Sequence, residues 1–159
     1  MKKAQYLSIM ILLIIFSCQQ KENQKQKGIF NIEAIKPIIQ KNGEVWGKAL
    51  RNKDISLISN LYDPKAHYLP NKDVALHGRE AITEYWKASM DFLTDLQLSM
   101  ESLEGTKELL YETGKGIVMV LNENGVIDTL SFKYVNVWKL NSSGKYKVVI
   151  DTFNDSIKQ

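Results

Sequence analysis

The sequence of 159 residues has little cysteine, histidine or proline: one, two and three residues, respectively. A single cysteine cannot form an intrachain disulfide, and it excludes a cysteine-rich zinc site. The formal net charge of +3 is too small to indicate a protein that binds nucleic acid. The apolar share of 44% is typical of a globular chain, and the length favours one domain.

The first residues have the pattern of a secretory signal. Two lysines precede an apolar segment at positions 6–16, whose 11 residues fall short of the ~20 that a membrane-spanning helix needs. The segment leads into Ile15-Phe16-Ser17-Cys18, which resembles a bacterial lipobox, although its aromatic residue departs from the usual small or aliphatic one.

The resemblance implies a lipoprotein in which residues 1–17 are a signal peptide and the Cys18 thiol receives a diacylglyceryl group. Cleavage then leaves Cys18 as the N-terminus, and two or more acyl chains such as palmitate anchor it stably in a membrane. Gln19 follows Cys18. In the lipoproteins that this pattern resembles, an aspartate at that position is common in those retained in the inner membrane. We therefore expect a cell-envelope protein anchored in the outer membrane. The alternative is an ordinary cleaved signal, or an uncleaved anchor, with an incidental cysteine.

A hydrophilic segment separates this cysteine from the remainder of the chain. Residues 19–28 are rich in glutamine and lysine and contain no apolar side chain. Such a segment cannot bury enough surface to offset its ordering entropy. We therefore predict a flexible tether over residues 18–29 and one folded domain over residues 30–157.

Hydrophobic periodicity predicts helices first and strands last in this domain. Apolar residues spaced by three and four indicate helices over residues 32–50, 55–61 and 79–90, with Pro37 in the first turn of the first helix. Short strands are expected at 66–69 and 74–76. From residue 96 the period becomes two, which indicates strands over 96–103, 109–121, 129–139 and 146–154. Asn-rich turns with glycine at 122–125 and 141–144 predict two hairpins, so the class is α+β.

The order of short motifs resembles the NTF2-like superfamily, in particular its SnoaL-like and DUF4440 branch. The matching pieces are Trp46 with Ala49, Asp54, Leu61-Tyr62, Pro70, Gly78-Arg79-Glu80-Ala81-Ile82 with Trp86, Glu112-Thr113-Gly114, the strand Lys133-Tyr134-Val135-Asn136-Val137-Trp138-Lys139, and Asp151-Thr152-Phe153-Asn154. The resemblance implies a cone in which a strongly curved antiparallel sheet wraps around about three N-terminal helices. It also implies a pocket for small, mostly apolar molecules.

Two polar residues are candidates for acid–base catalysis. Asp151 lies in an apolar strand, where a buried carboxyl has a raised pKa and suits proton transfer. His67 is a candidate base or hydrogen-bond donor at the pocket mouth. The alternatives are that Asp151 bonds to backbone or to Arg79, or faces water, and that His67 is exposed or at the edge of the core.

Other polar residues have simpler interpretations. His77 is expected on the surface, Glu112 in solvent because its neighbours alternate, and Arg79 paired with an acidic group. No cofactor motif is present, and the two histidines lack the spacing of a metal site.

Aromatic side chains are the candidate lining of the pocket, although plain core packing is the alternative for each. The predicted ligand-binding residues are Trp46, Tyr62, Tyr68, Trp86, Tyr134, Trp138, Phe153 and Asn154, with Tyr111 and Phe132 as further aromatic candidates.

Two functions are compatible with this sequence. The first is a lipid-anchored protein whose cone binds a small, mostly apolar ligand or a partner protein, with a homodimer through the sheet as a further expectation. The second is a cofactor-independent dehydratase or isomerase that uses a pocket acid or base. We prefer the first because no clear catalytic constellation is present.

Overall fold

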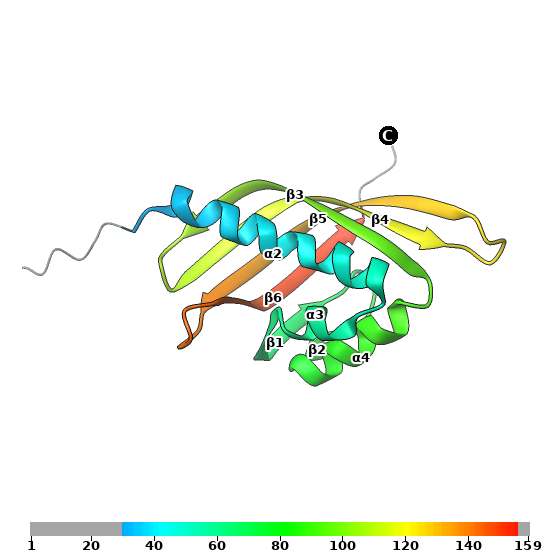
Figure 1. Ribbon diagram of the computed structural model, residues 1–159, viewed down its shortest axis with the longest axis horizontal. Helices are drawn as coiled ribbons and strands as arrows, with labels where there is room; N and C mark the ends of the chain where they lie inside the picture. Colours follow the sequence, from blue (N-terminus) through cyan, green and yellow to red (C-terminus); the bar gives the residue numbers. More distant parts are fainter. Residues whose placement is uncertain (1–29, 156–159) are drawn as a thin grey trace, which may run out of the picture.

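The structure is a computed structural model that describes residues 30–155, and these form three helices and one six-stranded sheet (Figure 1). The helices are α2 (Ile32–Asn52), α3 (Ile55–Ser59) and α4 (Arg79–Ser89). The strands are β1 (Tyr62–Leu69), β2 (Leu76–His77), β3 (Leu93–Gly105), β4 (Leu109–Leu121), β5 (Ile127–Leu140) and β6 (Tyr146–Asp155). The predicted signal peptide, Cys18 and the tether lie outside this range. Within it, no helix is long and apolar enough to cross a membrane.

The long helix α2 lies along one face of the curved sheet (Figure 1), which we call the inner face. The Asn31 side chain caps its start by accepting a hydrogen bond from the Glu33 backbone N–H at 3.1 Å. Pro37 lies in the second turn and not in the first, because the helix begins at Ile32. Gly47 permits close contact with β3, since a Cβ there would lie 2.3 Å from the Leu96 carbonyl oxygen.

The chain enters the sheet earlier than its sequence predicts. Helix α3 ends at Ser59, and the next residues join β6: the Val148 N–H donates to the Leu61 carbonyl at 2.9 Å, and Tyr62 pairs with Val148. Pro64 lies where the register between β1 and β6 is interrupted, so its missing N–H removes no regular ladder bond.

The strand order is β2-β1-β6-β5-β4-β3. All neighbours are antiparallel except β1 and β6, which run parallel, so the sheet is mixed where we predicted an antiparallel one. The α+β class is confirmed. Both predicted hairpins are present, and Gly125 and Gly144 at their turns each have a φ of 73°, the left-handed conformation that glycine adopts at little cost.

The core fills the space between the helices and the inner face. Its most deeply buried apolar side chains come from every layer: Ile39 and Leu50 of α2, Ile58 of α3, Ile82 of α4, and Tyr62, Leu110, Trp138 and Val148 of the sheet. Strict alternation on β4 and β5 places one set of residues in this core and leaves the other on the outer face.

Candidate functional site

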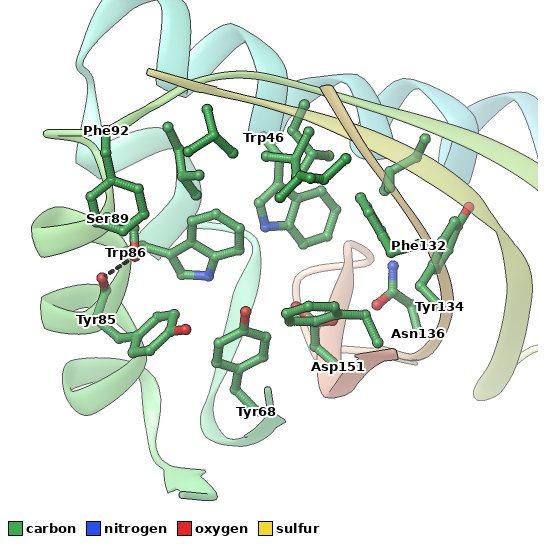
Figure 2. Close-up of a pocket in the computed structure, with 17 residues that line it drawn as sticks. Trp46, Tyr68, Tyr85, Trp86, Ser89, Phe92, Phe132, Tyr134, Asn136 and Asp151 are labelled. Carbon is green, nitrogen blue, oxygen red and sulfur yellow. Dashed lines mark hydrogen bonds between the residues drawn. The ribbon is translucent and has the colours of Figure 1, made fainter. Parts of the chain in front are cut away.

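The inner face of the sheet, α2 and α4 enclose a pocket of about 280 Å³ (Figure 2). Most of its lining is aromatic or aliphatic, and Ser89, Asn136 and Asp151 are the polar exceptions. The complete lining is Trp46, Tyr68, Tyr85, Trp86, Ser89, Phe92, Leu93, Leu96, Leu98, Val118, Val120, Leu130, Phe132, Tyr134, Asn136, Asp151 and Phe153. Cavities that are mostly apolar and carry a few polar groups are typical of small-molecule sites.

Four buried side chains with polar atoms lie in register across the inner face. Glu112 pairs with Asn136, Asn136 with Asp151, and Asp151 with Tyr68, so that they span β4, β5, β6 and β1. We call these four residues the polar row. Three of them, Tyr68, Asn136 and Asp151, line the pocket, and Figure 2 shows them gathered on one side of it, opposite Trp46.

A β-bulge places Asp151 in this row. The register of β6 against β5 shifts at Val149, which has no partner on β5. Strict alternation from the buried Val148 would place Asp151 on the outer face. The extra residue instead puts Val148 and Asp151 on the same side of the sheet, and both are buried.

Asp151 is held in a deeply buried hydrogen-bond chain. The Tyr62 hydroxyl donates to its Oδ2 at 2.5 Å, and the Trp86 indole N–H donates to the Tyr62 hydroxyl at 3.1 Å. Burial raises the pKa of the Asp151 carboxyl to about 7, the Tyr62 hydrogen bond opposes this rise, and the nearby Glu112 carboxylate adds to it. Asp151 therefore lines the pocket with a pKa near neutrality, where a carboxyl is suited to exchange protons.

Glu112 is buried, which corrects the prediction that it faces solvent. Only 2% of it is exposed, because it lies on the inner face beside Leu110 and Gly114, whereas Tyr111 points outward. The Tyr134 hydroxyl donates to its Oε1 at 2.7 Å and the Trp138 indole N–H to its Oε2 at 2.8 Å. Burial raises the pKa of Glu112, and these hydrogen bonds oppose that rise.

Two buried polar atoms among the described residues have no hydrogen-bond partner, and both belong to residues that line the pocket. They are the indole Nε1 of Trp46, a donor, and the amide Oδ1 of Asn136, an acceptor. Leaving such a group unpaired costs ~1–3 kcal/mol. The wall of the pocket thus contains one buried donor and one buried acceptor without partners.

Two glycines on β4 make room for the aromatic wall. Gly114 pairs with Tyr134 and Gly116 with Phe132. A Cβ on Gly114 would lie 2.6 Å from the Tyr134 hydroxyl oxygen, and one on Gly116 would lie 2.2 Å from Phe132 Cζ. Both aromatic rings therefore pack closely over the backbone of β4 while they line the pocket.

His67 lies outside the pocket. It is exposed on β1 and meets the exposed His77 of β2, with their Nδ1 atoms 2.7 Å apart. Its predicted place at the pocket mouth is therefore wrong, whereas the surface position of His77 is as expected. Arg79 forms no ion pair within residues 30–155; its Nε donates to the Tyr62 carbonyl at 2.9 Å, which corrects the expected acidic partner.

The predicted aromatic residues fall into three groups. Those that line the pocket are Trp46, Tyr68, Trp86, Phe132, Tyr134 and Phe153. Tyr62 and Trp138 are fully buried behind the pocket wall, where they bind the two buried carboxyls. Asn154 and Tyr111 are exposed, so neither lines the pocket.

Among the aromatic and polar residues that line the pocket, four were not predicted from the sequence: Tyr85, Ser89, Phe92 and Asn136. Alternation gives a signal for Asn136, because it lies midway between Tyr134 and Trp138 on the same face. Ser89 lies three residues after Trp86, on the same side of α4. Among residues 30–155, no group of three or more His, Cys, Asp or Glu side chains is placed to hold a metal ion.

Many solved structures are similar to this chain. An NTF2-like superfamily protein from Salmonella enterica serovar Typhimurium aligns with a TM-score of 0.69 at 12% identity, covering 81% of this chain and 96% of that one. A ketosteroid isomerase-like protein from Erwinia carotovora atroseptica has a TM-score of 0.68 at 13% identity, covering 82% and 100%. A conserved protein from Planctomyces limnophilus has a TM-score of 0.67 at 13% identity, covering 78% and 99%.

No protein-family model and no curated protein sequence matches the chain. At 12–13% identity, the likeness to solved structures carries the fold alone. That likeness extends over about four fifths of the chain and nearly all of each of the three relatives, and the chain accordingly has the NTF2-like fold.

Proposed function

We propose that this chain is a lipid-anchored protein of the cell envelope whose pocket binds one small, mostly apolar, uncharged molecule. The observation that carries the ligand-binding part is the cavity of about 280 Å³, which combines aromatic and aliphatic walls with buried polar atoms. Burial of apolar ligand surface supplies the main favourable term, at ~25 cal/mol per Å².

The polar atoms of the pocket restrict the ligand further. A ligand that reaches the buried Trp46 N–H and the buried Asn136 oxygen gains most if it offers an acceptor to the first and a donor to the second. Because Trp46 lies opposite Asn136 across the pocket (Figure 2), the acceptor and the donor belong on different parts of the ligand. An anionic ligand is disfavoured, because Asp151 and Glu112 are carboxyls in a buried environment and their ionised forms repel it.

A titration with a neutral aromatic probe tests the binding function. One molecule of N-phenyl-1-naphthylamine should bind to each chain and quench the fluorescence of Trp46 and Trp86, which line the pocket. Val118→Trp should abolish binding by filling the cavity. The matched control is Val126→Trp, at a residue 56% exposed in the β4–β5 turn, and it should bind as the unmodified chain does. Equal binding by both variants would place the probe elsewhere.

A second candidate function is proton transfer to or from a bound molecule, favoured by the position of Asp151 in the pocket with a pKa of about 7. Isomerisation and dehydration begin with abstraction of a proton next to a carbonyl, and this carboxyl is poised to accept it. The chain should then catalyse deuterium exchange from D₂O into 1-tetralone, measured by mass spectrometry, and Asp151→Asn should abolish the excess rate. Exchange at the uncatalysed rate in both proteins would contradict proton transfer and leave ligand binding as the only proposed function of the pocket.

The anchor is proposed from the sequence around Cys18. Cys18→Ala should release the protein from membranes or leave an unprocessed precursor with residues 1–17 attached. Mass spectrometry of the membrane fraction should find a diacylglyceryl group on Cys18 of the unmodified chain. Unchanged membrane fractionation and maturation of the variant would contradict the proposed anchor, and this result would not bear on ligand binding in the pocket.

The outer face of the sheet is the proposed contact for a partner protein or a second copy of the chain. It carries exposed apolar side chains on three adjacent strands, Tyr111 of β4, Val135 of β5 and Ile150 of β6. Light scattering should give a dimer mass that Val135→Glu reduces to the monomer. A monomer at high concentration, with no partner captured, would contradict this contact.

A further inference from the structure

A second hollow lies at the end of the molecule where the described chain begins, and it shares no lining residue with the ligand pocket. It measures about 660 Å³ and is bordered by the start of α2 and by the β3–β4 and β5–β6 turns, which lie at the same end of the molecule (Figure 1). Phe30, Ile35 and Ile38 form part of its apolar lining. Three lysines, at 107, 145 and 147, line it as well. We call this hollow the basic groove.

The basic groove carries an excess of positive charge. None of its three lysines forms an ion pair within residues 30–155. Burial and the like charges of Arg79 and Lys145 lower the pKa of Lys147, and the Asp63 carboxylate offsets only part of this effect. Glu108, which acts on Tyr146, is a second carboxylate at this end. Lys145 and Lys147 therefore repel one another, and an anionic group beside them is favoured, while the Lys147 Nζ also donates to the Asn60 carbonyl.

Apolar surface lies directly beside these cations. Ile38 is 49% exposed although it belongs to the apolar side of α2, and Phe30, Ile35 and Leu140 are half-buried. An apolar hollow edged by lysines fits a molecule with an apolar body and an anionic head, because the ammonium groups meet the head while the lining covers the apolar part.

The position of the groove in the chain indicates where such a molecule comes from. Phe30 is both a lining residue and the first described residue, and residues 19–29 connect it to Cys18. A segment of that length spans at most ~40 Å when fully extended. With Cys18 in a membrane, the end of the molecule that carries the groove is the end held near the lipid headgroups.

We propose that the basic groove binds anionic phospholipid at the membrane surface, with the phosphate against the lysines and acyl carbons on the apolar lining. This inference goes beyond the ligand pocket and rests on the proposed anchor only for proximity to the membrane. It gives the domain a fixed orientation, with the groove toward the lipid.

Site-resolved NMR of the full-length chain tests the inference. Dihexanoyl phosphatidylglycerol, kept below its micelle concentration, should bind saturably and shift the amide signals of Phe30, Ile38 and Lys145. Dihexanoyl phosphatidylcholine should bind more weakly. Neutralising one lysine should weaken phosphatidylglycerol binding about fivefold, so the double variant Lys107→Gln/Lys145→Gln should weaken it roughly 30-fold. Lys48→Gln/Lys133→Gln, at exposed positions outside the groove, should have no effect.

Several outcomes would overturn the inference. They are amide shifts elsewhere in the domain only, equal binding of the two phospholipids, and an unchanged affinity of the Lys107→Gln/Lys145→Gln variant. Competition by inorganic phosphate at equal affinity would identify a phosphate site, and a concentration-dependent dimer that covers Ile38 would identify a second copy as the occupant. N-phenyl-1-naphthylamine binding in the same samples reports on the ligand pocket separately, so failure of one site is distinguishable from failure of the other.

Discussion

Replacing Asp151 by asparagine should remove a large part of the pH dependence of stability. The pKa of this carboxyl rises from its ordinary value of 3.8 to about 7 on folding, chiefly because the group is buried. The folded state therefore holds the proton more tightly than the unfolded state. The resulting stabilisation is complete below pH 3.8, is lost progressively as the pH rises toward 7, and does not change further above that.

The magnitude follows from the two pKa values. Each pKa unit corresponds to about 1.4 kcal/mol, so the rise from 3.8 to about 7 destabilises the ionised folded state by roughly 4 kcal/mol. Asparagine has nearly the same shape, cannot ionise, and still accepts the Tyr62 hydrogen bond through its amide oxygen. The variant should therefore match the unmodified chain near pH 4 and exceed its stability above pH 7.

Urea unfolding followed by tryptophan fluorescence at pH 4, 6 and 8 measures the effect. The difference in unfolding free energy between Asp151→Asn and the unmodified chain should grow with pH in favour of the variant. Asp91→Asn, at an exposed position, is the matched control and should give a difference that does not change with pH. Parallel curves for Asp151→Asn and the unmodified chain would refute the assignment of a near-neutral pKa to this buried carboxyl.

Three further predictions concern Glu112 and two glycines. Glu112→Gln removes the carboxylate that helps to raise the pKa of Asp151, so the ¹³C NMR titration of the Asp151 carboxyl should move to lower pH; an unmoved titration would mean that the two groups do not interact. Gly116→Ala should lower the unfolding free energy by about 1–3 kcal/mol in urea unfolding, because its Cβ would lie 2.2 Å from Phe132 Cζ. Gly43→Ala should instead stabilise the chain by up to ~1 kcal/mol, because alanine favours a helix more than glycine does. Gly43 lies inside α2, and its added Cβ would meet Leu98 of β3 at an ordinary contact distance of 3.8 Å. Equal effects at the two glycines would contradict the packing described for β4.

The regular parts of the fold are those that hydrophobic periodicity encodes. The stripe that includes Ile39, Trp46 and Leu50 predicts α2, and the Asn-rich turns ending in Gly125 and Gly144 predict the hairpins. Each of these signals is local, since it depends only on residues that are adjacent in the sequence. The parallel contact of β1 with β6 joins segments more than 80 residues apart, and no local signal encodes it.

The site was harder to predict because it depends on irregularities and on pairing between strands. A bulge at Val149 aims Asp151 at the pocket, and strict alternation from Val148 would have turned it outward. Glu112 was predicted in solvent because its neighbours in the strand alternate. Its partners, Tyr134 and Trp138, lie on the neighbouring strand and become visible only once the register is known.

Mass spectrometry of the chain under non-denaturing conditions, after purification from the cells that produce it, tests ligand binding most directly. We predict one bound molecule per chain, uncharged and mostly apolar, with an acceptor to meet Trp46 and a donor to meet Asn136. The molecule should be missing from Val118→Trp and present in Val126→Trp. A chain without any bound molecule, an anionic or strongly polar one, or the same molecule in both variants would contradict the proposed pocket.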